Sequence, residues 1–438
     1  MYIRIKRNEE ELQEWRKGLT EIIKYPLPNL STLRIESIIG RGGGGKVFVV
    51  QSRQDGKLYA LKVIDKLQTF KTAKAFRHVS SERLIMERFG RHPFLLHVEF
   101  AFQSDANLFI GSQFCPGGDL ASYIRQKGNR SIPYDGKDYI GSVQTGRPRR
   151  YPRLTEEQTR SIACEIVLGL EHLHSKGVVY RDLKPENIFI DEDGHLKIGD
   201  YGLAKLLEEP SSGTRSLRTA SVCGTRNYLS PEMLAGKPYS YESDMWSFGV
   251  MLYRIMIGAF PFDANRTKEV FQRIKKDTLD TPNWLSTEAR ELLRGLLQKD
   301  PRKRLTAERM KRMPFFAKVD WDAVLRKNCS PSISDVSVGD RLSDVLENFD
   351  LTKLEGISVG DYMYGHIEEA TPATAPSHKR DPRGILIGFE YAHKDEDRLN
   401  DGPELLVKTR SGGLFSRITS LDFDQLPSPR GIFSSGSK

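Results

Sequence analysis

The sequence predicts an α+β fold with two lobes, a small β-rich N-terminal lobe and a large helical C-terminal lobe. Apolar stretches at 33–39 and 47–50 flank a run of glycines, which predicts a hairpin of two strands. A further strand is expected at 58–64, and a helical run follows at 79–86. With 438 residues, of which 38% are hydrophobic, the chain can bury a sizeable core and still carry extensions.

The glycine run in the first hairpin has the spacing of a loop that holds phosphates, G-x-G-x-x-G-x-V. Without side chains, its backbone N–H groups can approach the phosphates of a nucleotide. A flexible linker is the alternative for a glycine run, but the flanking strands favour the hairpin. The residues expected to bind nucleotide here are Ile39, Gly40, Arg41, Gly42, Gly43, Gly44, Gly45, Lys46 and Val47.

Lys62 lies within the strand expected at 58–64, among apolar neighbours. An unpaired ammonium group there would be costly, so it needs an anionic partner. Glu82, in the helical run, is the best candidate, and the pair would leave Lys62 to bind the α and β phosphates. An ordinary surface salt bridge is the alternative interpretation of this pair.

Two later stretches carry the residues that phosphoryl transfer from ATP requires, VYRDLKPEN at 179–187 and IGDYG at 198–202. Asp182 can accept the proton of an attacking hydroxyl, and Lys184 would lie beside the transferred group. Asn187 and Asp200 offer oxygen ligands for Mg²⁺. Each short motif within these stretches would be weak evidence alone, but their order and spacing together predict a protein kinase.

The chain resembles the AGC group of eukaryotic serine/threonine protein kinases, which includes cAMP-dependent protein kinase, protein kinase C and protein kinase B. The resemblance rests on the motifs above and on GGDL at 117–120, CGT at 223–225, SPE at 230–232, DMWSFG at 244–249, NFD at 348–350 and LIGFEY at 386–391. It implies a bilobal protein kinase fold with an AGC-type C-terminal tail.

The resemblance also implies roles for further residues. Gln113 and Cys115 would present the hinge backbone to adenine, and Asp119 would bind the ribose. The remaining nucleotide contacts that it implies are Ala60 and Phe189. Arg181 would couple the catalytic base to the activation loop, and Arg304 would pair with Glu232 to hold the activation segment against the large lobe.

Two positions depart from the common pattern around the nucleotide. Ser112 aligns with the gatekeeper beside the adenine pocket, which predicts an enlarged back pocket that accepts bulky inhibitors. Tyr201 replaces phenylalanine after Asp200, so its buried hydroxyl must find a hydrogen-bond partner.

Substrate preference is expected from the catalytic loop. Lys184 and Thr225 resemble the residues of serine/threonine kinases, so the acceptors should be Ser or Thr. Glu186 and Asp119 could attract arginines upstream of the acceptor. Gln272 stands where arginine-directed relatives place a glutamate, which leaves this preference open.

Regulation is expected from phosphorylation. Ser221 matches the activation-loop phosphosite, and a phosphate there could pair with Arg181. An upstream kinase or another copy of this chain could add it. Glu390 occupies the position where many relatives carry a phosphorylated residue, while Leu386 replaces the usual phenylalanine. Thr371 is a candidate phosphorylation site of the turn-motif type. The alternative, that it is an ordinary threonine without such a role, has about equal weight.

The expected boundaries place the kinase domain at 34–316, with an N-lobe at 34–112, a hinge at 113–118 and a C-lobe at 119–316. An exposed insertion is expected at about 128–152, a tail at 317–391, and an extension of disordered composition at 392–438. Residues 1–24 resemble the last strand and helix of a pleckstrin-homology domain, before a linker at 25–33. Truncation of a longer gene and a plain helix packing on the small lobe both stay open, and lipid binding would need a complete domain upstream.

Composition argues against other classes. The net charge is +9, but the basic residues are spread along the chain with no aromatic-interleaved stripe, so nucleic-acid binding is not expected. The start lacks the apolar core of a signal peptide, and the longest apolar stretch, 248–262, is broken by Arg254. Four scattered cysteines fit a reducing compartment. We expect a soluble, cytoplasmic monomer that acts on proteins. A catalytically silent pseudokinase scaffold is the alternative, and the presence of every catalytic group favours an active enzyme.

Overall fold

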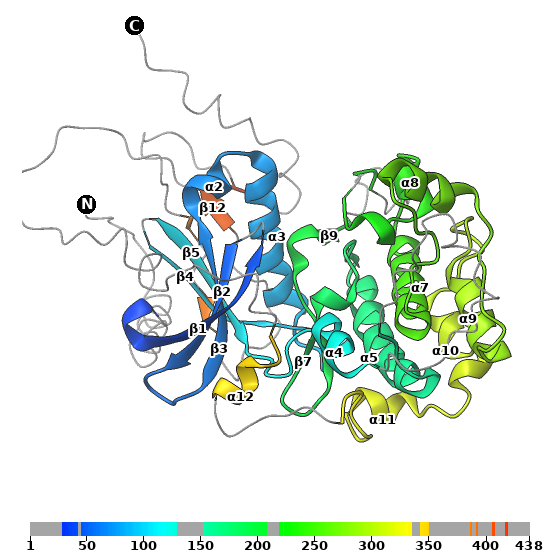
Figure 1. Cartoon of the computed structure of the whole chain (residues 1–438). Helices are drawn as coiled ribbons and strands as arrows, with labels where there is room; N and C mark the ends of the chain where they lie inside the picture. Colours follow the sequence, from blue (N-terminus) through cyan, green and yellow to red (C-terminus); the bar gives the residue numbers. More distant parts are fainter. Residues whose placement is uncertain are drawn as a thin grey trace, which may run out of the picture.

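The computed structural model describes residues 29–42, 45–104, 106–128, 152–207, 219–221, 223–334 and 342–349, together with four short strands in the tail. It has two lobes that lie side by side, one built on a sheet and one built of helices (Figure 1). The fold class expected from the sequence is therefore confirmed. None of the described helices has the length and apolar character needed to cross a membrane.

The N-terminal lobe is an antiparallel sheet in the order β1-β2-β3-β5-β4-β11. Its strands are β1 (Leu33–Gly42), β2 (Gly45–Ser52), β3 (Leu58–Asp65), β4 (Val98–Gln103), β5 (Asn107–Gln113) and β11 (Tyr391–Ala392). Side chains alternate across the sheet, so Phe48 and Val50 join one core cluster while Val49 joins another. The short 3-10 turn Leu30–Thr32 precedes the first strand.

The first hairpin closes where Gly42 pairs with Gly45. Gly45 has φ +140, and a Cβ atom there would lie 2.3 Å from the carbonyl oxygen of Val63. Only glycine therefore lets β2 pass this close to β3 at the mouth of the hairpin.

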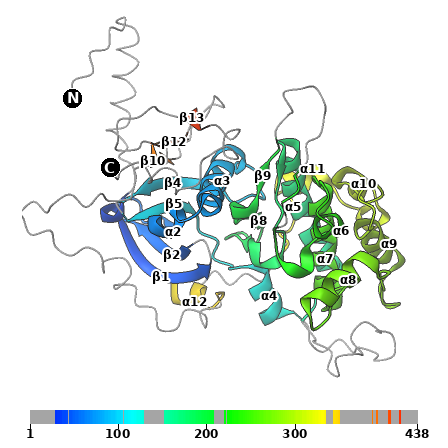
Figure 2. The ribbon, with the colours of Figure 1, turned by 90° about the horizontal axis from the view of Figure 1, so that it is seen from above.

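Two helices cover the sheet, α2 (Lys66–Phe70) and α3 (Ala73–Phe89) (Figure 2). The side chain of Thr72 caps α3 by accepting a hydrogen bond from the backbone N–H of Ala75 at 3.1 Å. The helix begins directly after this cap, at Ala73, and is therefore longer than the run expected at 79–86. It packs on the 3-10 turn Tyr201–Leu203 and so carries Glu82 to the junction of the lobes.

The C-terminal lobe is organised around two long helices, α5 (Glu156–Ser175) and α7 (Glu242–Ile257). Most of α7 is buried, and it packs against α5 and α9. The apolar stretch noted at 248–262 thus begins as a core helix, which ends at Gly258 with φ +73. The other helices are α4 (Leu120–Lys127), α6 (Pro231–Leu234), α8 (Thr267–Lys276), α9 (Thr287–Leu296), α10 (Ala307–Lys311) and α11 (Trp321–Leu325).

Two small antiparallel ribbons lie where the lobes meet. In one, β6 (Val178–Val179) pairs with β9 (Lys205–Leu206), and in the other, β7 (Ile188–Ile190) pairs with β8 (Leu196–Ile198). The catalytic loop runs from β6 to β7 and includes the 3-10 turn Pro185–Asn187. These ribbons fix both ends of that loop.

The tail returns to the N-terminal lobe. Helix α12 (Leu342–Leu346) places Val345 in a buried cluster with Val49 and Phe114. Phe349 then stacks on Phe114, with ring centroids 5.9 Å apart.

Strands further along the tail were not all expected. The sequence did not predict β12 (Leu405–Val407) or β13 (Arg417–Ile418), which form a sheet with β10 (Leu386–Ile387). Such short strands depend on pairing with one another rather than on a local pattern. Residues 1–24, most of the insertion, Thr371 and Glu390 lie outside the described residues.

Candidate active site

A cavity of about 1250 Å³ lies between the lobes. The glycine hairpin, α3, the hinge, the catalytic loop and Phe349 of the tail all contribute to its walls. Of the residues expected to bind nucleotide, those that line it are Ile39, Gly40, Arg41, Gly45, Lys46, Val47, Ala60, Lys62, Gln113, Cys115, Asp119 and Phe189. Gly42 ends strand β1, and Gly43 and Gly44 lie outside the described residues.

Lys62 and Glu82 meet across this cavity as a bidentate pair. The Nζ atom of Lys62 lies 2.5 Å from Oε1 and 2.7 Å from Oε2 of Glu82, and 3.9 Å from Oδ1 of Asp200. Burial by itself would lower the pKa of Lys62, but the carboxylates of Glu82 and Asp200 outweigh it and raise that pKa. Lys62 is therefore held as a cation on the wall of the cavity.

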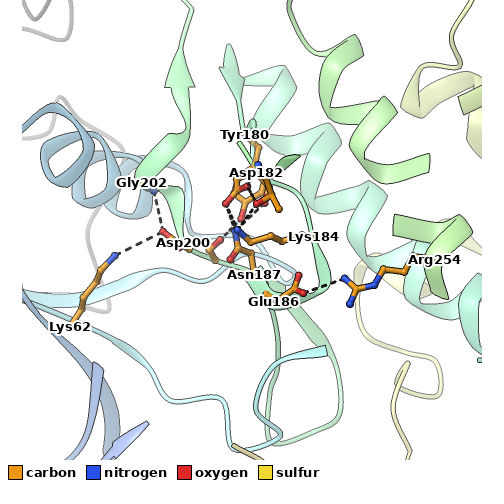
Figure 3. A network of polar contacts seen from close by, with 11 residues as sticks. Lys62, Tyr180, Asp182, Lys184, Glu186, Asn187, Asp200, Gly202 and Arg254 are labelled. Atoms are coloured by element: carbon orange, nitrogen blue, oxygen red, sulfur yellow. Dashed lines mark hydrogen bonds and ion pairs between the residues drawn. The ribbon is translucent and has the colours of Figure 1, made fainter. Parts of the chain in front are cut away.

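Asp182 is buried on the floor of the cavity, where four hydrogen bonds orient its carboxylate (Figure 3). Lys184 Nζ donates to Oδ2 at 2.6 Å, and Asn187 Nδ2 donates to the same oxygen at 3.1 Å. Thr225 donates to Oδ1 from both its hydroxyl, at 2.8 Å, and its backbone N–H, at 3.1 Å. Thr225 also accepts from Lys184 Nζ at 2.9 Å.

Asp244, at the start of α7, anchors the catalytic loop from below. Its carboxylate is fully buried and accepts from the backbone N–H groups of Tyr180 and Arg181, each at 2.8 Å, and lies 2.8 Å from His174 Nε2. Arg181 has φ +71, which is unfavourable for a side chain of its size. The two hydrogen bonds hold this strained backbone in place. No role was assigned to Asp244 from the sequence. A carboxylate in the first turn of a largely apolar helix is the signal that could have indicated one.

Asn187 and Asp200 present oxygen atoms that suit a hard cation. The amide nitrogen of Asn187 donates to Asp182, so its Oδ1 atom is the one that could bind a metal ion. Half of the Asp200 side chain is exposed. Within the described part of the chain no group of three His, Cys, Asp or Glu could hold a metal ion.

The buried hydroxyl of Tyr201 has a partner. It donates to the carbonyl oxygen of Ile198 at 2.7 Å, and its ring packs edge-on against that of Tyr180. The Tyr180 hydroxyl in turn donates to the carbonyl oxygen of Gly199. The substitution at position 201 therefore leaves no unsatisfied polar group.

Arg181 connects the catalytic loop to the activation segment. Its Nη1 atom donates to Ser221 Oγ at 2.8 Å, and its Nε atom donates to the carbonyl oxygen of Leu203 at 2.6 Å. Ser221 is exposed, and its carbonyl oxygen accepts from the Tyr239 hydroxyl. The serine hydroxyl is thus accessible and already beside a guanidinium group.

Arg304 and Glu232 form the pair that the resemblance implied. Two guanidinium nitrogens lie 2.7 and 2.9 Å from the two carboxylate oxygens, and both side chains are buried. The Arg304 guanidinium also lies 5.2 Å from the centre of the Trp246 ring. The helix that follows the activation segment is thereby tied to the core of the large lobe.

Comparison with known sequences agrees with this geometry. The family described as "Protein kinase domain" matches residues 33–316. The chain belongs to the protein kinase family. The kinase is similar to the RAC family serine/threonine-protein kinase homolog of Dictyostelium discoideum, with 34% identity over 333 residues, which cover 75% of this chain and 67% of the relative.

Other relatives agree with this assignment. A probable serine/threonine-protein kinase of Dictyostelium discoideum is 34% identical over 376 residues, or 85% of this kinase and 73% of the relative. Ribosomal protein S6 kinase alpha-2 of Homo sapiens is 35% identical over 309 residues, which are 69% of this kinase but 38% of that longer protein. The kinase is a serine/threonine protein kinase of the AGC group, as the sequence motifs predicted.

Proposed function

We propose that this kinase transfers the γ-phosphoryl group of Mg-ATP to serine and threonine hydroxyls of protein substrates. The observation that carries the proposal is the position of Asp182, whose carboxylate lies in the cavity and is oriented by Lys184, Asn187 and Thr225. A carboxylate held in this way can accept the proton of an attacking hydroxyl.

In the transfer, the acceptor oxygen forms a bond to the γ phosphorus while the bond from that phosphorus to the bridging oxygen breaks, and ADP leaves. The hydroxyl proton passes to Asp182. Lys184 bridges Asp182 and Thr225, so its positive charge lies beside the group in transit. Thr225, which donates to Asp182, would help to place the acceptor hydroxyl of Ser or Thr near the base.

The nucleotide would be held by groups from both lobes. Asn187 and Asp200 would bind Mg²⁺ through their side-chain oxygens, and the bound ion would supply positive charge against the phosphates. Lys62, fixed by Glu82, would bind the α and β phosphates. The β1–β2 hairpin would cover them with backbone N–H groups. The hinge residues Gln113 and Cys115 would meet adenine, Asp119 the ribose, and Ala60 and Phe189 would complete the pocket.

Phosphorylation of Ser221, by an upstream kinase or by another copy of this one, would raise activity. A phosphate on Ser221 would meet the guanidinium of Arg181, whose backbone adjoins Asp182. Order in the activation segment would then be coupled to the geometry of the base.

The tail would add a second level of regulation. Strand β11 pairs with the edge strand β4 of the N-terminal lobe, Tyr391 opposite Ala101. This main-chain pairing supports docking of the segment that carries Glu390 without a phosphate at that position. Thr371 is a further candidate for phosphorylation.

The test is a comparison of phosphoryl transfer by the wild type and by Asp182→Asn, with Asp193→Asn as the control. Asp193 is an exposed carboxylate in the β7–β8 turn, outside the cavity. We expect Asp182→Asn to lose activity by on the order of a hundredfold or more, because a positioned base is lost. Asp193→Asn should behave like the wild type. Equal rates for all three proteins would support a scaffold without catalysis.

A further inference from the structure

Arg254 enters the active-site cavity from helix α7, on the side of Glu186 (Figure 3). Its Nη1 atom lies 3.2 Å from Glu186 Oε1 and donates to the Tyr228 hydroxyl at 2.8 Å. The guanidinium also lies 5.0 Å from the centre of the Phe260 ring. Three groups from separate elements therefore hold this side chain in one orientation.

The position of this guanidinium changes what Glu186 can do. Glu186 lies four residues after Asp182 and lines the same cavity, and 45% of its side chain is exposed. An exposed carboxylate beside the catalytic base would attract an arginine from a substrate. Here one of its two oxygens already faces a cation, because Arg254 lines the same cavity and lies 3.2 Å from it.

Arg254 remains charged in this setting. Its burial opposes the charged form, but the Tyr228 hydroxyl and the Glu186 carboxylate outweigh that effect and raise its pKa. A substrate arginine would have to displace a guanidinium that is already ordered, or bind Glu186 beside a like charge. Both routes remove the advantage that charge pairing normally gives.

The second acid expected to attract arginine is also engaged. Asp119 caps helix α4: its Oδ1 accepts from the backbone N–H of Ser122 at 2.9 Å, and its Oδ2 accepts from the Ser122 hydroxyl at 2.7 Å. Arg125 donates to that same hydroxyl at 2.7 Å. Each of the two acids therefore has an arginine close by, and the net charge of these four side chains is zero.

We infer that Arg254 is a specificity-determining residue that occupies Glu186, so that this kinase does not select arginine upstream of the acceptor and takes neutral or acidic side chains there. The inference rests on the proposed function, because it assumes that protein substrates bind in this cavity. It extends that function by naming the substrate class.

The test compares Ser-containing peptides that differ only in having Arg, Ala or Glu at one upstream position at a time. The full chain is used, and both kcat/KM and the affinity of fluorescent peptides are measured. For the wild type we expect Arg to give no advantage over Ala at any upstream position. For Arg254→Met, which keeps most of the apolar volume, we expect Arg to gain about tenfold over Ala at one position, as a freed carboxylate would provide.

The double variant Arg254→Met with Glu186→Gln is the matched control and should lose that gain. If Arg254 only supported the fold around Tyr228, all peptides would weaken equally and the Arg-to-Ala ratio would not move, which overturns the inference. A wild-type preference for arginine of about tenfold would overturn it as well. Because peptide binding requires no phosphoryl transfer, the measured affinities test the role of Arg254 even if the catalytic proposal fails.

Discussion

Arg181 donates a hydrogen bond from Nη1 to the Oγ atom of Ser221, at 2.8 Å, across forty residues of sequence. The backbone of Arg181 is itself fixed by Asp244, directly before Asp182, the proposed catalytic base. A change of charge at Ser221 therefore acts on a residue that adjoins Asp182.

Replacing Ser221 with Ala should lower activity by about tenfold relative to the phosphorylated wild type, because a charge-assisted contact is lost. Transfer rates on one peptide, with phosphorylation at Ser221 followed by mass spectrometry, measure this. Arg181→Met should remove the response to phosphorylation. Full activity in Ser221→Ala would contradict the mechanism.

Replacing Asp244 with Asn should destabilise the protein by about 3 kcal/mol and reduce transfer, because a buried backbone N–H would then face an amide NH₂ group. Urea unfolding and initial rates measure the two effects. Glu308→Gln, which removes an exposed ion pair with Arg312, should change stability by less than about 0.5 kcal/mol. If the two variants were equally stable, the anchoring role of Asp244 would be wrong.

The kinase should lose stability in mild acid through His92. Burial lowers the pKa of His92 from 6.5 to about 4, and the neighbouring His172 and Lys197 act in the same direction. The unfolded chain takes up this proton below pH 6.5 and the folded chain does not, so stability falls as pH drops from 6.5 toward 4, by at most about 1.4 kcal/mol per pH unit for one proton.

Urea midpoints at pH 7 and pH 5 measure that loss. His92→Asn, which keeps an acceptor for the backbone N–H of Phe94, should show a smaller loss than the wild type. An identical loss in both proteins would assign the acid sensitivity to other groups.

Bulky ATP-competitive inhibitors should bind the wild type at least about tenfold more tightly than Ser112→Met, because overpacking a small site costs on the order of 1 to 3 kcal/mol. Ser112 lines the cavity on strand β5, opposite Ala60 of β3. Inhibition constants for one bulky and one compact compound give the comparison. Ser112→Ala should remain as sensitive as the wild type, and equal sensitivity of Ser112→Met would disprove the enlarged pocket.

Replacing Tyr201 with Phe should cost about 1 kcal/mol or less and leave the transfer rate near that of the wild type. The carbonyl oxygen of Ile198 also accepts from the backbone N–H of Leu96, so it stays paired. Thermal unfolding and initial rates measure both. A large loss of activity would show that the Tyr201 hydroxyl does more than satisfy Ile198.

The sequence predicted those parts of the site in which residue type and spacing carry the chemistry. A lysine in an apolar strand required an acid, and the structure places Glu82 at 2.5 Å from it. Asp182 and Asn187 belong to one motif, and the structure likewise places them in hydrogen-bond contact. The pairing of Glu186 with Arg254 was not predictable in this way, because 68 residues separate them and only the packing of α7 brings them close. The pairing of β11 with β4 depends on chain geometry in the same manner.

The stacking of Phe349 on Phe114 means that the proposed nucleotide site is assembled from two distant stretches of the sequence. Asn348 donates to the carbonyl oxygen of Pro116, and a Cβ atom on Gly118 would lie 2.5 Å from the Asn348 carbonyl oxygen. A chain that ended before residue 342 would keep strands β1 to β5 and the helical lobe, but it would lack the Phe349 wall of the cavity. Substitutions in this stretch of the tail should therefore lower the affinity for ATP. A side chain at position 118 should have the same effect, because it would collide with the backbone of Asn348.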